Sequence, residues 1–251
     1  MNIYDKFTYF YTKGNWPQYS EKMATLLPAV FEKFNLKPKT ILDIACGDGA
    51  FVVAMAKLGY QTVGVDQSLK QIKFAKERAK REKVKTEFFI QDIRSLSFKN
   101  KFDLLTCWYD SLNYILELNE LERTFLGVTR ALKKGGVFIF DMNTVFGLAV
   151  NWHKHPAHVY QDEENRFLIG SHPFPFDFEK NIAIMRITGF LKKGNSWQRM
   201  DEEHKEKGYT IEEIKNCLKK ATLEELACFG SLEQMTELKA DSPRVWFVAR
   251  K

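Results

Sequence analysis

The chain has 251 residues, of which 45% are hydrophobic and 28% are charged, and its formal net charge is +6. These values are typical of a globular protein with one full core, built as one domain or as one domain with an insertion. No apolar run approaches the roughly 20 residues of a membrane span. The first residues, Met1 to Lys6, have neither the apolar core of a signal peptide nor a transit-peptide composition. We therefore expect a cytoplasmic protein that does not bind a membrane.

Metal and disulfide chemistry is not indicated. The four cysteines lie apart, without C-x-x-C spacing, at Cys46, Cys107, Cys217 and Cys228. They predict neither a zinc site nor a disulfide framework. The histidines of the polar connection, His153, His155 and His158, have no nearby set of cysteine or acidic ligands, so we interpret them as loop residues.

In chain order, the first predicted helix spans 17–34, where apolar residues recur at helical spacing. A strand over 41–44 then leads through the small residues 45–49 into a helix over 50–56. Such a turn places free backbone N–H groups beside a ligand at the carboxyl end of the strand. The turn lacks the third glycine of a dinucleotide fingerprint, because Val52 stands there, and no Gly-Lys-Ser/Thr of a phosphate-binding loop follows. A site for another small cofactor is the prediction.

Two further predicted strands end in acids. They span 61–66 and 88–93 and place Asp66 and Asp92 near their carboxyl ends. Strands over 102–107 and 136–141 follow, with helices between most of them, including one capped by Ser68 and one over 119–132. This alternation predicts a doubly wound parallel sheet. Each acid alone could be an ordinary capping or turn residue, but Asp43, Asp66 and Asp92 at successive strand ends indicate one shared ligand.

A basic stretch over 70–85 is compatible with RNA binding. Apolar residues at helical spacing interrupt it, however, at Ile72, Phe74, Ala75 and Ala79. We favour a solvated helix face, so nucleic acid is not excluded as a partner but is not favoured.

The alternation of predicted strands and helices ends after Asp141. Strand-like runs over 166–170, 182–191 and 197–207 are separated by turn residues at 179–181 and 193–195. A capping box, Thr210 to Glu213, restarts helical structure, and strands over 222–229 and 244–250 end the chain. We predict an α/β core, residues 1–150 and 209–251, that contains an antiparallel β insert, residues 151–208. As strand residues, Glu202, His204 and Glu206 share one face.

The pattern D-x-A-x-G-x-G at 43–49, with the two later acids, resembles class I S-adenosylmethionine (SAM)-dependent methyltransferases. The resemblance implies a seven-stranded, mostly parallel Rossmann-like sheet of strand order 3-2-1-4-5-7-6. Two short motifs of the chain are similar to motifs of small-molecule N-methyltransferases such as the sugar N,N-dimethyltransferases. The stretches that carry this similarity are Glu203-His204-Lys205-Glu206 and Cys107 to Tyr114. Tyr114 departs from the pattern, since the sugar enzymes tend to have histidine there.

The resemblance also implies the cofactor and its contacts. SAM, or its product S-adenosylhomocysteine, is expected to place its ribose hydroxyls on Asp66 and its adenine on Asp92 and Ile93. Gly47 and Gly49 are expected to let the backbone approach the methionine part. An aromatic segment over 4–19 is expected to close over the cofactor as a flap, or else to act as a hydrophobic staple for the first helix. The full predicted set of cofactor contacts is Tyr11, Tyr19, Asp43, Ala45, Cys46, Gly47, Asp48, Asp66, Gln67, Gln91, Asp92, Ile93 and Cys107. Cys107 is also interpreted as a buried strand residue.

The predicted function is methyl transfer to a small-molecule acceptor by proximity, with assistance from a general base. Tyr114 and His204 are the candidate catalytic residues, and His204 could equally be a structural histidine beside acids. The alternatives are an RNA or protein methyltransferase, a non-catalytic SAM-binding protein and, more distantly, a nicotinamide-dependent oxidoreductase.

Overall fold

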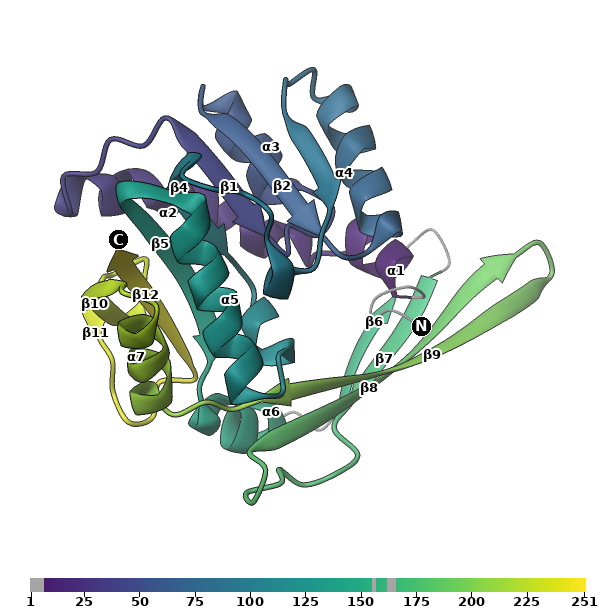
Figure 1. Ribbon diagram of the computed structural model, residues 1–251. Coiled ribbons are helices and arrows are strands. Elements are labelled where there is room, and N and C mark those ends of the chain that lie inside the picture. The colour runs from purple at the N-terminus through teal and green to yellow at the C-terminus, as the bar shows by residue number, and fades with distance from the viewer. Residues whose placement is uncertain (1–6, 155–156, 162–165) are drawn as a thin grey trace.

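The computed structural model describes residues 7–154, 157–161 and 166–251 (Figure 1). The described residues form a sheet of eight strands and a sheet of four strands. The four strands of the smaller sheet lie in the chain between the fifth and sixth strands of the larger one. The strand order of the large sheet is β11-β10-β12-β5-β4-β1-β2-β3. Its strands are β1 (Thr40–Ile44), β2 (Gln61–Asp66), β3 (Glu87–Ile90), β4 (Phe102–Cys107), β5 (Leu132–Asn143), β10 (Glu224–Ser231), β11 (Thr236–Glu237) and β12 (Arg244–Arg250).

This topology confirms the predicted fold. β1 pairs in parallel with β2 and β4, while β3 and β5 continue the parallel sheet outward on either side. The last strand, β12, lies antiparallel between β5 and β10, as the order 3-2-1-4-5-7-6 requires. β11 is a two-residue addition at the edge that the sequence did not predict. Because all central strands are parallel, their carboxyl ends meet at one edge of the sheet.

Helices cover both faces of the large sheet (Figure 1). α2, α3 and α4 pack in sequence on one face, while α5 and α7 pack together on the other. Ser68 caps α4 and a capping box starts α7, both as predicted. The helices are α1 (Thr8–Lys13), α2 (Pro17–Lys33), α3 (Ala50–Lys57), α4 (Leu69–Arg81), α5 (Leu118–Ala131), α6 (Trp152–Lys154) and α7 (Ile211–Lys220), with the short turns η1 (Ile93–Ser95), η2 (Ser111–Tyr114) and η3 (Gly147–Asn151).

The strands are apolar on both faces because both faces are covered. Leu42, Leu105 and Phe140 belong to the core beneath α5 and α7. Their sequence neighbours Ile41 and Leu104 belong to a second core beneath α2 and α3. Polar side chains lie at the carboxyl edge of the large sheet, beside these two cores. The basic face of α4 is exposed, while Ile72, Ala75 and Ala79 are buried beneath it, as expected of a solvated helix.

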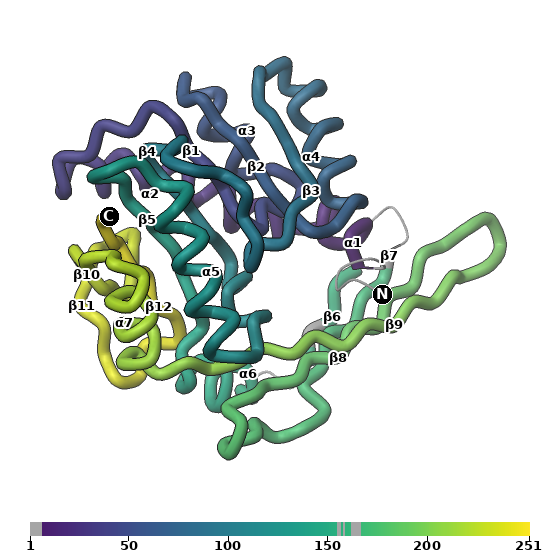
Figure 2. The backbone as a smooth tube through the Cα atoms, in the orientation of Figure 1, coloured from purple at the N-terminus to yellow at the C-terminus, as the bar shows by residue number. Residues whose placement is uncertain are grey.

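The smaller sheet is antiparallel and lies in the chain between β5 and α7. It contains β6 (Ala157–Gln161), β7 (Arg166–Ser171), β8 (Ile182–Lys193) and β9 (Ser196–Lys207), in that order. β8 and β9 pair along their whole length and form a long hairpin that extends away from the large sheet (Figure 2). β6 was not predicted as a strand. On β9, His204 and Glu206 are buried while Glu203 and Lys205 are exposed, so the predicted alternation is confirmed.

Candidate functional site

A cavity of about 300 Å³ opens at the carboxyl ends of β1, β2 and β4, and we call it the strand-end cavity. Its wall combines the turn after β1, the segments after β2, β3 and β4, and single residues of α1, α2 and α4. The lining residues are Tyr11, Ser20, Asp43, Ala45, Cys46, Gly47, Asp66, Gln67, Gln71, Gln91, Asp92, Ile93, Arg94, Trp108, Tyr109, Ser111, Tyr114 and Ile115.

The structure brings most of the predicted cofactor contacts together in this cavity. Three predicted residues do not line it. Tyr19 lies on α2, where its ring stacks on Tyr109 with centroids 4.6 Å apart. Asp48 is turned away and forms a buried ion pair with Arg78 of α4. Cys107 is fully buried in β4 within the core beneath α5.

Asp66 holds the turn after β1 against the end of β2. One carboxylate oxygen accepts a hydrogen bond from the Gly47 N–H at 2.9 Å, and the other accepts from the Ser68 N–H at 2.8 Å. Burial raises the pKa of Asp66, whereas these two N–H groups act to lower it. Each carboxylate oxygen keeps a further lone pair, and Asp66 lines the cavity.

The two glycines of the turn have different roles. Both have positive φ angles, +53° at Gly47 and +74° at Gly49. Gly47 lines the cavity, as predicted. Gly49 does not: a Cβ there would lie 2.8 Å from the Phe88 ring and 2.9 Å from Ala75. Its lack of a side chain therefore serves the packing of α4 and β3, which corrects the expectation that it lets the backbone approach a ligand.

Asp43 lies at the bottom of the cavity, 3% exposed. It accepts a hydrogen bond from the Thr106 hydroxyl at 2.6 Å. Burial raises the pKa of this carboxyl well above its usual range; the Thr106 bond opposes the shift and the charge of Asp66 adds to it. Two buried carboxyl groups, those of Asp43 and Asp66, therefore line the strand-end cavity.

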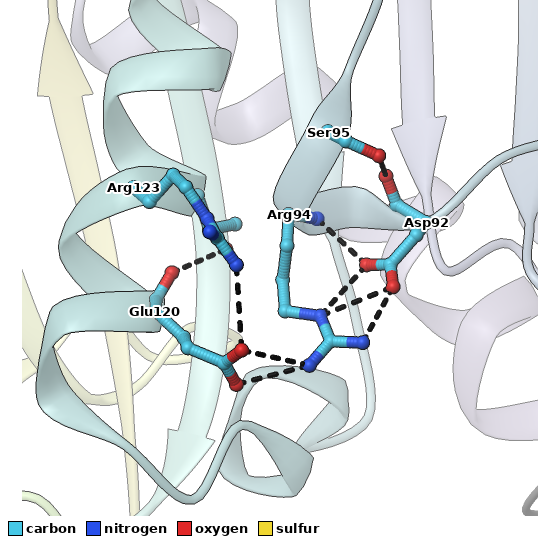
Figure 3. A network of polar contacts seen from close by, with 6 residues as sticks. Asp92, Arg94, Ser95, Glu120 and Arg123 are labelled. Atoms are coloured by element: carbon cyan, nitrogen blue, oxygen red, sulfur yellow. Dashed lines mark hydrogen bonds and ion pairs between the residues drawn. The ribbon is translucent and has the colours of Figure 1, made fainter.

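Asp92 follows β3 and caps the short helix η1 (Figure 3). Both of its oxygens accept hydrogen bonds from the Arg94 guanidinium, the shortest at 2.6 Å, and Arg94 also binds Glu120 at 2.9 Å. These bonds from Arg94 lower the pKa of Asp92. Arg123 makes a further contact with Glu120. The predicted acid is therefore in the cavity wall, and Arg94 already neutralises it.

A second cavity of about 270 Å³, which we call the insert cavity, adjoins the first. The two cavities share Tyr11, Tyr109 and Tyr114 in their walls. The large sheet contributes one side and the smaller sheet the other, while α1 contributes aromatic rings. Its remaining lining residues are Phe7, Trp16, Asp110, Asn143, Trp152, Val159, Tyr160, Leu168, Gly170, His172, Met185, Ile187, His204, Glu206 and Arg244.

Tyr114 and His204, each predicted as a candidate catalytic residue, contact each other in this wall. The Tyr114 hydroxyl lies 2.9 Å from His204 Nδ1, and His204 Nε2 lies 3.2 Å from Glu202. A carboxylate accepts only, so Nε2 is assigned the proton and Nδ1 accepts from the phenol. Glu202 in turn accepts from the Phe7 N–H at 3.2 Å, which ties α1 to β9. His204 is 1% exposed, so it is not solvated, and its contact with Glu202 on the edge strand β9 is also what a structural histidine beside acids would make.

Charged residues that the sequence did not single out lie in the wall of the insert cavity, at Asp110 and Arg244, and behind it, at Asp141. Arg244, at the start of β12, binds Asp110 at 2.8 Å and also forms an ion pair with Asp141. Asp141 accepts hydrogen bonds from the N–H groups of Tyr109 and Asp110 at 2.7 and 3.1 Å, which fixes the segment after β4. Tyr109 and Asp110 both have positive φ angles, so this segment needs that support.

The strand-end cavity also contains residues that were not predicted. Arg94 and Trp108 are close in sequence to residues that were predicted to contact the cofactor. Ser20 and Gln71 lie on predicted helices, but nothing in those helix sequences indicated a contact with a ligand. Gln71 and Trp108 are each 3% exposed, and the Gln71 Oε1 and Trp108 Nε1 atoms have no hydrogen-bond partner. Buried polar atoms of this kind are costly unless a ligand satisfies them.

Two further points concern the described residues, 7–154, 157–161 and 166–251. They contain no group of three or more His, Cys, Asp or Glu side chains arranged to hold a metal ion. Within the same ranges, no helix has the length and apolar character that crossing a membrane requires.

Comparison with known proteins gives the family. Residues 41–136 match the family model of the methyltransferase domain. A provisionally named methyltransferase of Geobacillus sp. (strain WCH70) is 30% identical, with 99% of each chain covered. A SAM-dependent methyltransferase from Clostridium acetobutylicum ATCC 824 superposes with a TM-score of 0.83 at 29% identity, again with 99% of each chain covered. The chain therefore belongs to the SAM-dependent methyltransferases, and its cofactor is SAM.

More distant structures share the fold. The sugar N-methyltransferase KedS8 from Streptoalloteichus sp. ATCC 53650 superposes with a TM-score of 0.73 at 17% identity, covering 100% of this chain and 93% of that one. SAM-bound CalS10, an amino pentose methyltransferase from Micromonospora echinaspora, gives a TM-score of 0.69 at 16% identity. At these identities the likeness concerns the fold only.

The strand-end cavity fits SAM. The unpartnered Gln71 Oε1 needs a donor and the unpartnered Trp108 Nε1–H needs an acceptor. A nucleoside joined to an amino acid offers both. A Cβ at Gly47 would meet the Tyr11 ring at 3.7 Å, an ordinary van der Waals contact, so the positive φ angle of +53° rather than lack of space favours glycine at this point of the cavity wall.

Proposed function

We propose that the protein transfers a methyl group from SAM to a small molecule bound in the insert cavity. One observation carries the proposal: the insert cavity adjoins the cofactor cavity and shares Tyr11, Tyr109 and Tyr114 with it. The cavity's modest volume and aromatic walls suit a small molecule better than a macromolecular surface. Residues 151–208 then serve as an insert that shapes the acceptor site on a core made of 1–150 and 209–251.

The residues of the cavity wall support a set of proposed cofactor contacts. Asp66 accepts hydrogen bonds from the ribose hydroxyls with the lone pairs left free by Gly47 and Ser68. Gly47 and Tyr11 border the methionine part. Asp92, with Ile93, lies on the adenine side. Arg94 already donates hydrogen bonds to both oxygens of Asp92. The Asp92 carboxylate therefore has two roles, since it orients Arg94 in the cavity wall and also contacts the adenine base.

Bound SAM supplies an electrophilic methyl group on a positively charged sulfur. The main contribution of the chain is placement, because an in-line displacement at carbon needs the acceptor atom held close to that methyl group. Such positioning can contribute roughly 7–11 kcal/mol in the best intramolecular models. Tyr114 stands where the two cavities meet, and its hydroxyl can accept a proton from the acceptor as it passes its own proton to His204.

Deuterated SAM and mass spectrometry test the proposal. The wild-type protein should transfer a CD₃ group to at least one compound in a panel of small amines, alcohols, phenols and thiols. Tyr114→Phe should lower kcat by roughly 100-fold, the usual size of a proton-transfer contribution. It should leave the Kd of SAM within about twofold, because only the hydroxyl is removed.

Tyr60→Phe is the matched control, since Tyr60 contacts Phe31 in the core beneath α2, away from both cavities. Transfer by Tyr114→Phe at the wild-type rate would remove the proton relay from the mechanism. SAM binding without transfer to any compound would instead support a non-catalytic SAM-binding protein.

A further inference from the structure

Lysines gather at the amino edge of the large sheet, at the end remote from the smaller sheet (Figure 1). The strands β1 to β5 are parallel, so the segments that lead into them lie together at this edge. We call these segments the amino-edge surface; they are the connections 34–39, 58–60, 82–86 and 96–101 and the irregular start of β5, 132–136. They contain eight lysines and one acid, Glu82. Their net charge is therefore +7, compared with +6 for the whole chain.

Contacts between the segments bring several of these lysines together. The Lys133 ammonium group binds the Asp103 carboxylate at 2.8 Å, and the same carboxylate accepts a hydrogen bond from the Lys39 N–H at 3.0 Å. A recess of about 150 Å³ opens beside Asp103, and Lys37 and Lys134 line it. Positive charges from distant parts of the sequence thus border one small area.

Most of these lysines have no charged partner within the described residues, 7–154, 157–161 and 166–251. Six of the eight are exposed and make no ion pair or hydrogen bond through their ammonium groups there: Lys37, Lys39, Lys83, Lys85, Lys99 and Lys134. Glu82 does not neutralise them, because it already binds Lys57 at 2.5 Å and Arg81 at 3.2 Å. Clustered charges of one sign raise the local concentration of ions of the opposite sign, so the surface suits a ligand with many negative charges.

Helix ends account for only part of this pattern. A basic residue in the last turn of a helix offsets the macrodipole, which explains Arg81 at the end of α4. The effect fades beyond that turn. Lys37 and Lys39 lie four and six positions after the last residue of α2, and Lys99 and Lys101 follow a segment without helical structure. These four lysines need another explanation.

The cavity end of the molecule has the opposite polarity. The described walls of the two cavities contain five acids and two arginines, and they contain no lysine. The strands β1 and β2, of five and six residues, separate the two ends by about 16–20 Å. A polyanion is therefore attracted to the amino edge and repelled from the cavities. At the amino edge it lies too far from the cofactor to receive a methyl group.

We propose that the amino-edge surface binds a nucleic acid through its sugar–phosphate backbone, as an anchor and not as the methyl acceptor. This inference goes beyond the proposed function and does not depend on it. Five neighbouring strands span about 19 Å, and over that length one strand of a duplex presents about six phosphates. Lysine ammonium groups pair with phosphates as point charges and carry no sequence information there, so binding is independent of sequence.

An anionic membrane suits the surface less well. Binding to a bilayer gains strength from apolar side chains that enter the interface. Of the large apolar side chains in these segments, Leu58 is the exposed one, at 57%. The helical part of the basic stretch, on α4, is a separate surface on the outer face of that helix, and its lysines supply a control.

Fluorescence anisotropy on the full chain tests the proposal, with a labelled DNA duplex of about 20 base pairs and an RNA duplex of the same sequence. Both should bind, because only phosphates are contacted. About six phosphate contacts predict that affinity for the DNA falls roughly 40-fold when KCl rises from 50 to 100 mM. Lys37→Gln/Lys134→Gln should weaken binding by about 10-fold or more and reduce the slope of log Kd against log[KCl] by about 2.

Lys73→Gln/Lys76→Gln is the matched control, since it removes the same charge from the exposed face of α4. It should bind both duplexes as the wild type does. An equal loss in the two double variants, or no binding of either duplex at about 50 mM KCl, would overturn the proposal. Tighter binding to vesicles of phosphatidylcholine and phosphatidylserine in equal parts than to the duplexes would overturn the choice of partner.

Methyl transfer separates this proposal from the proposed function. Both double variants should keep the wild-type Kd for SAM and the wild-type rate of transfer to a small molecule, because the substituted lysines lie outside both cavities. Transfer of a CD₃ group from deuterated SAM to either duplex would overturn the role of an anchor. Duplex binding through Lys37 and Lys134 by a protein that methylates no small molecule would overturn the proposed function and leave this inference standing.

Discussion

Asp66→Asn is the most informative single change in the cofactor cavity. In the wild type, the two carboxylate oxygens accept from the N–H groups of Gly47 and Ser68 at 2.9 and 2.8 Å. An asparagine has one oxygen, so it can serve one N–H while its NH₂ group faces the other. One charge-assisted hydrogen bond is lost and one buried donor is left unpaired, which together cost about 1.5–3 kcal/mol of unfolding free energy.

The same change should weaken SAM binding. The ribose hydroxyls lose a charged acceptor, and the turn that holds Gly47 loses an anchor. A loss of about 1.4–2.8 kcal/mol corresponds to a 10- to 100-fold rise in Kd. Isothermal titration with SAM and with S-adenosylhomocysteine measures the affinity, and urea unfolding of the free protein measures the stability.

Asp103→Asn separates the two effects. Asp103 accepts from the N–H groups of Lys39 and Thr40 at 3.0 and 2.9 Å, but at the amino end of β4, remote from both cavities. It should lose about 1 kcal/mol of unfolding free energy and keep the wild-type Kd for SAM. If Asp66→Asn bound SAM within twofold of the wild type while the protein stayed folded, the assignment of Asp66 to the ribose would be wrong.

Further expected outcomes concern the turn and the response to acid. Gly49→Ala should destabilise the fold by roughly 1–3 kcal/mol, because its Cβ would press on the Phe88 ring at a positive φ angle, whereas Gly47→Ala should chiefly raise the Kd of SAM. Equal unfolding midpoints for the two variants would contradict this difference. Burial acts to raise the pKa of Asp103, but bonds from Lys133 and from backbone N–H groups lower it to about 2. Its contribution, about 1 kcal/mol after allowance for partial exposure, is present above the unfolded-state pKa of 3.8 and is lost as the pH falls toward 2. Acid titration of stability should therefore be flatter for Asp103→Asn than for the wild type, and parallel curves would refute the assignment.

The sequence by itself predicted the features that depend on neighbours along the chain. Hydrophobic runs, the small-residue turn and the capping box define the strands and helices locally, and the order of the strands followed from a family resemblance. Asp43, Asp66 and Asp92 could be placed together because the carboxyl ends of parallel strands lie at one edge of a sheet. The alternation of His204 and Glu206 with exposed residues followed from the period of a strand.

The direction of a side chain in a turn could not be predicted in the same way. Asp48 follows Gly47 in the turn but points to Arg78, 30 residues further along the chain. Cys107 ends a strand like the acids do, yet it faces the helices rather than the cavity. These outcomes depend on which partner lies on each side of a residue, and distant segments supply that partner.

The insert cavity is wholly a product of tertiary structure. Arg244 meets Asp110 across 134 positions of sequence because β12 returns antiparallel beside β5. Glu206 reaches the same place from the second sheet, and Phe7 reaches it from the first helix. Local pattern determines which residues are strand, turn or helix. The charge balance of a cavity is decided only when those elements pack, because burial and the nearest opposite charge exist only in the assembled fold.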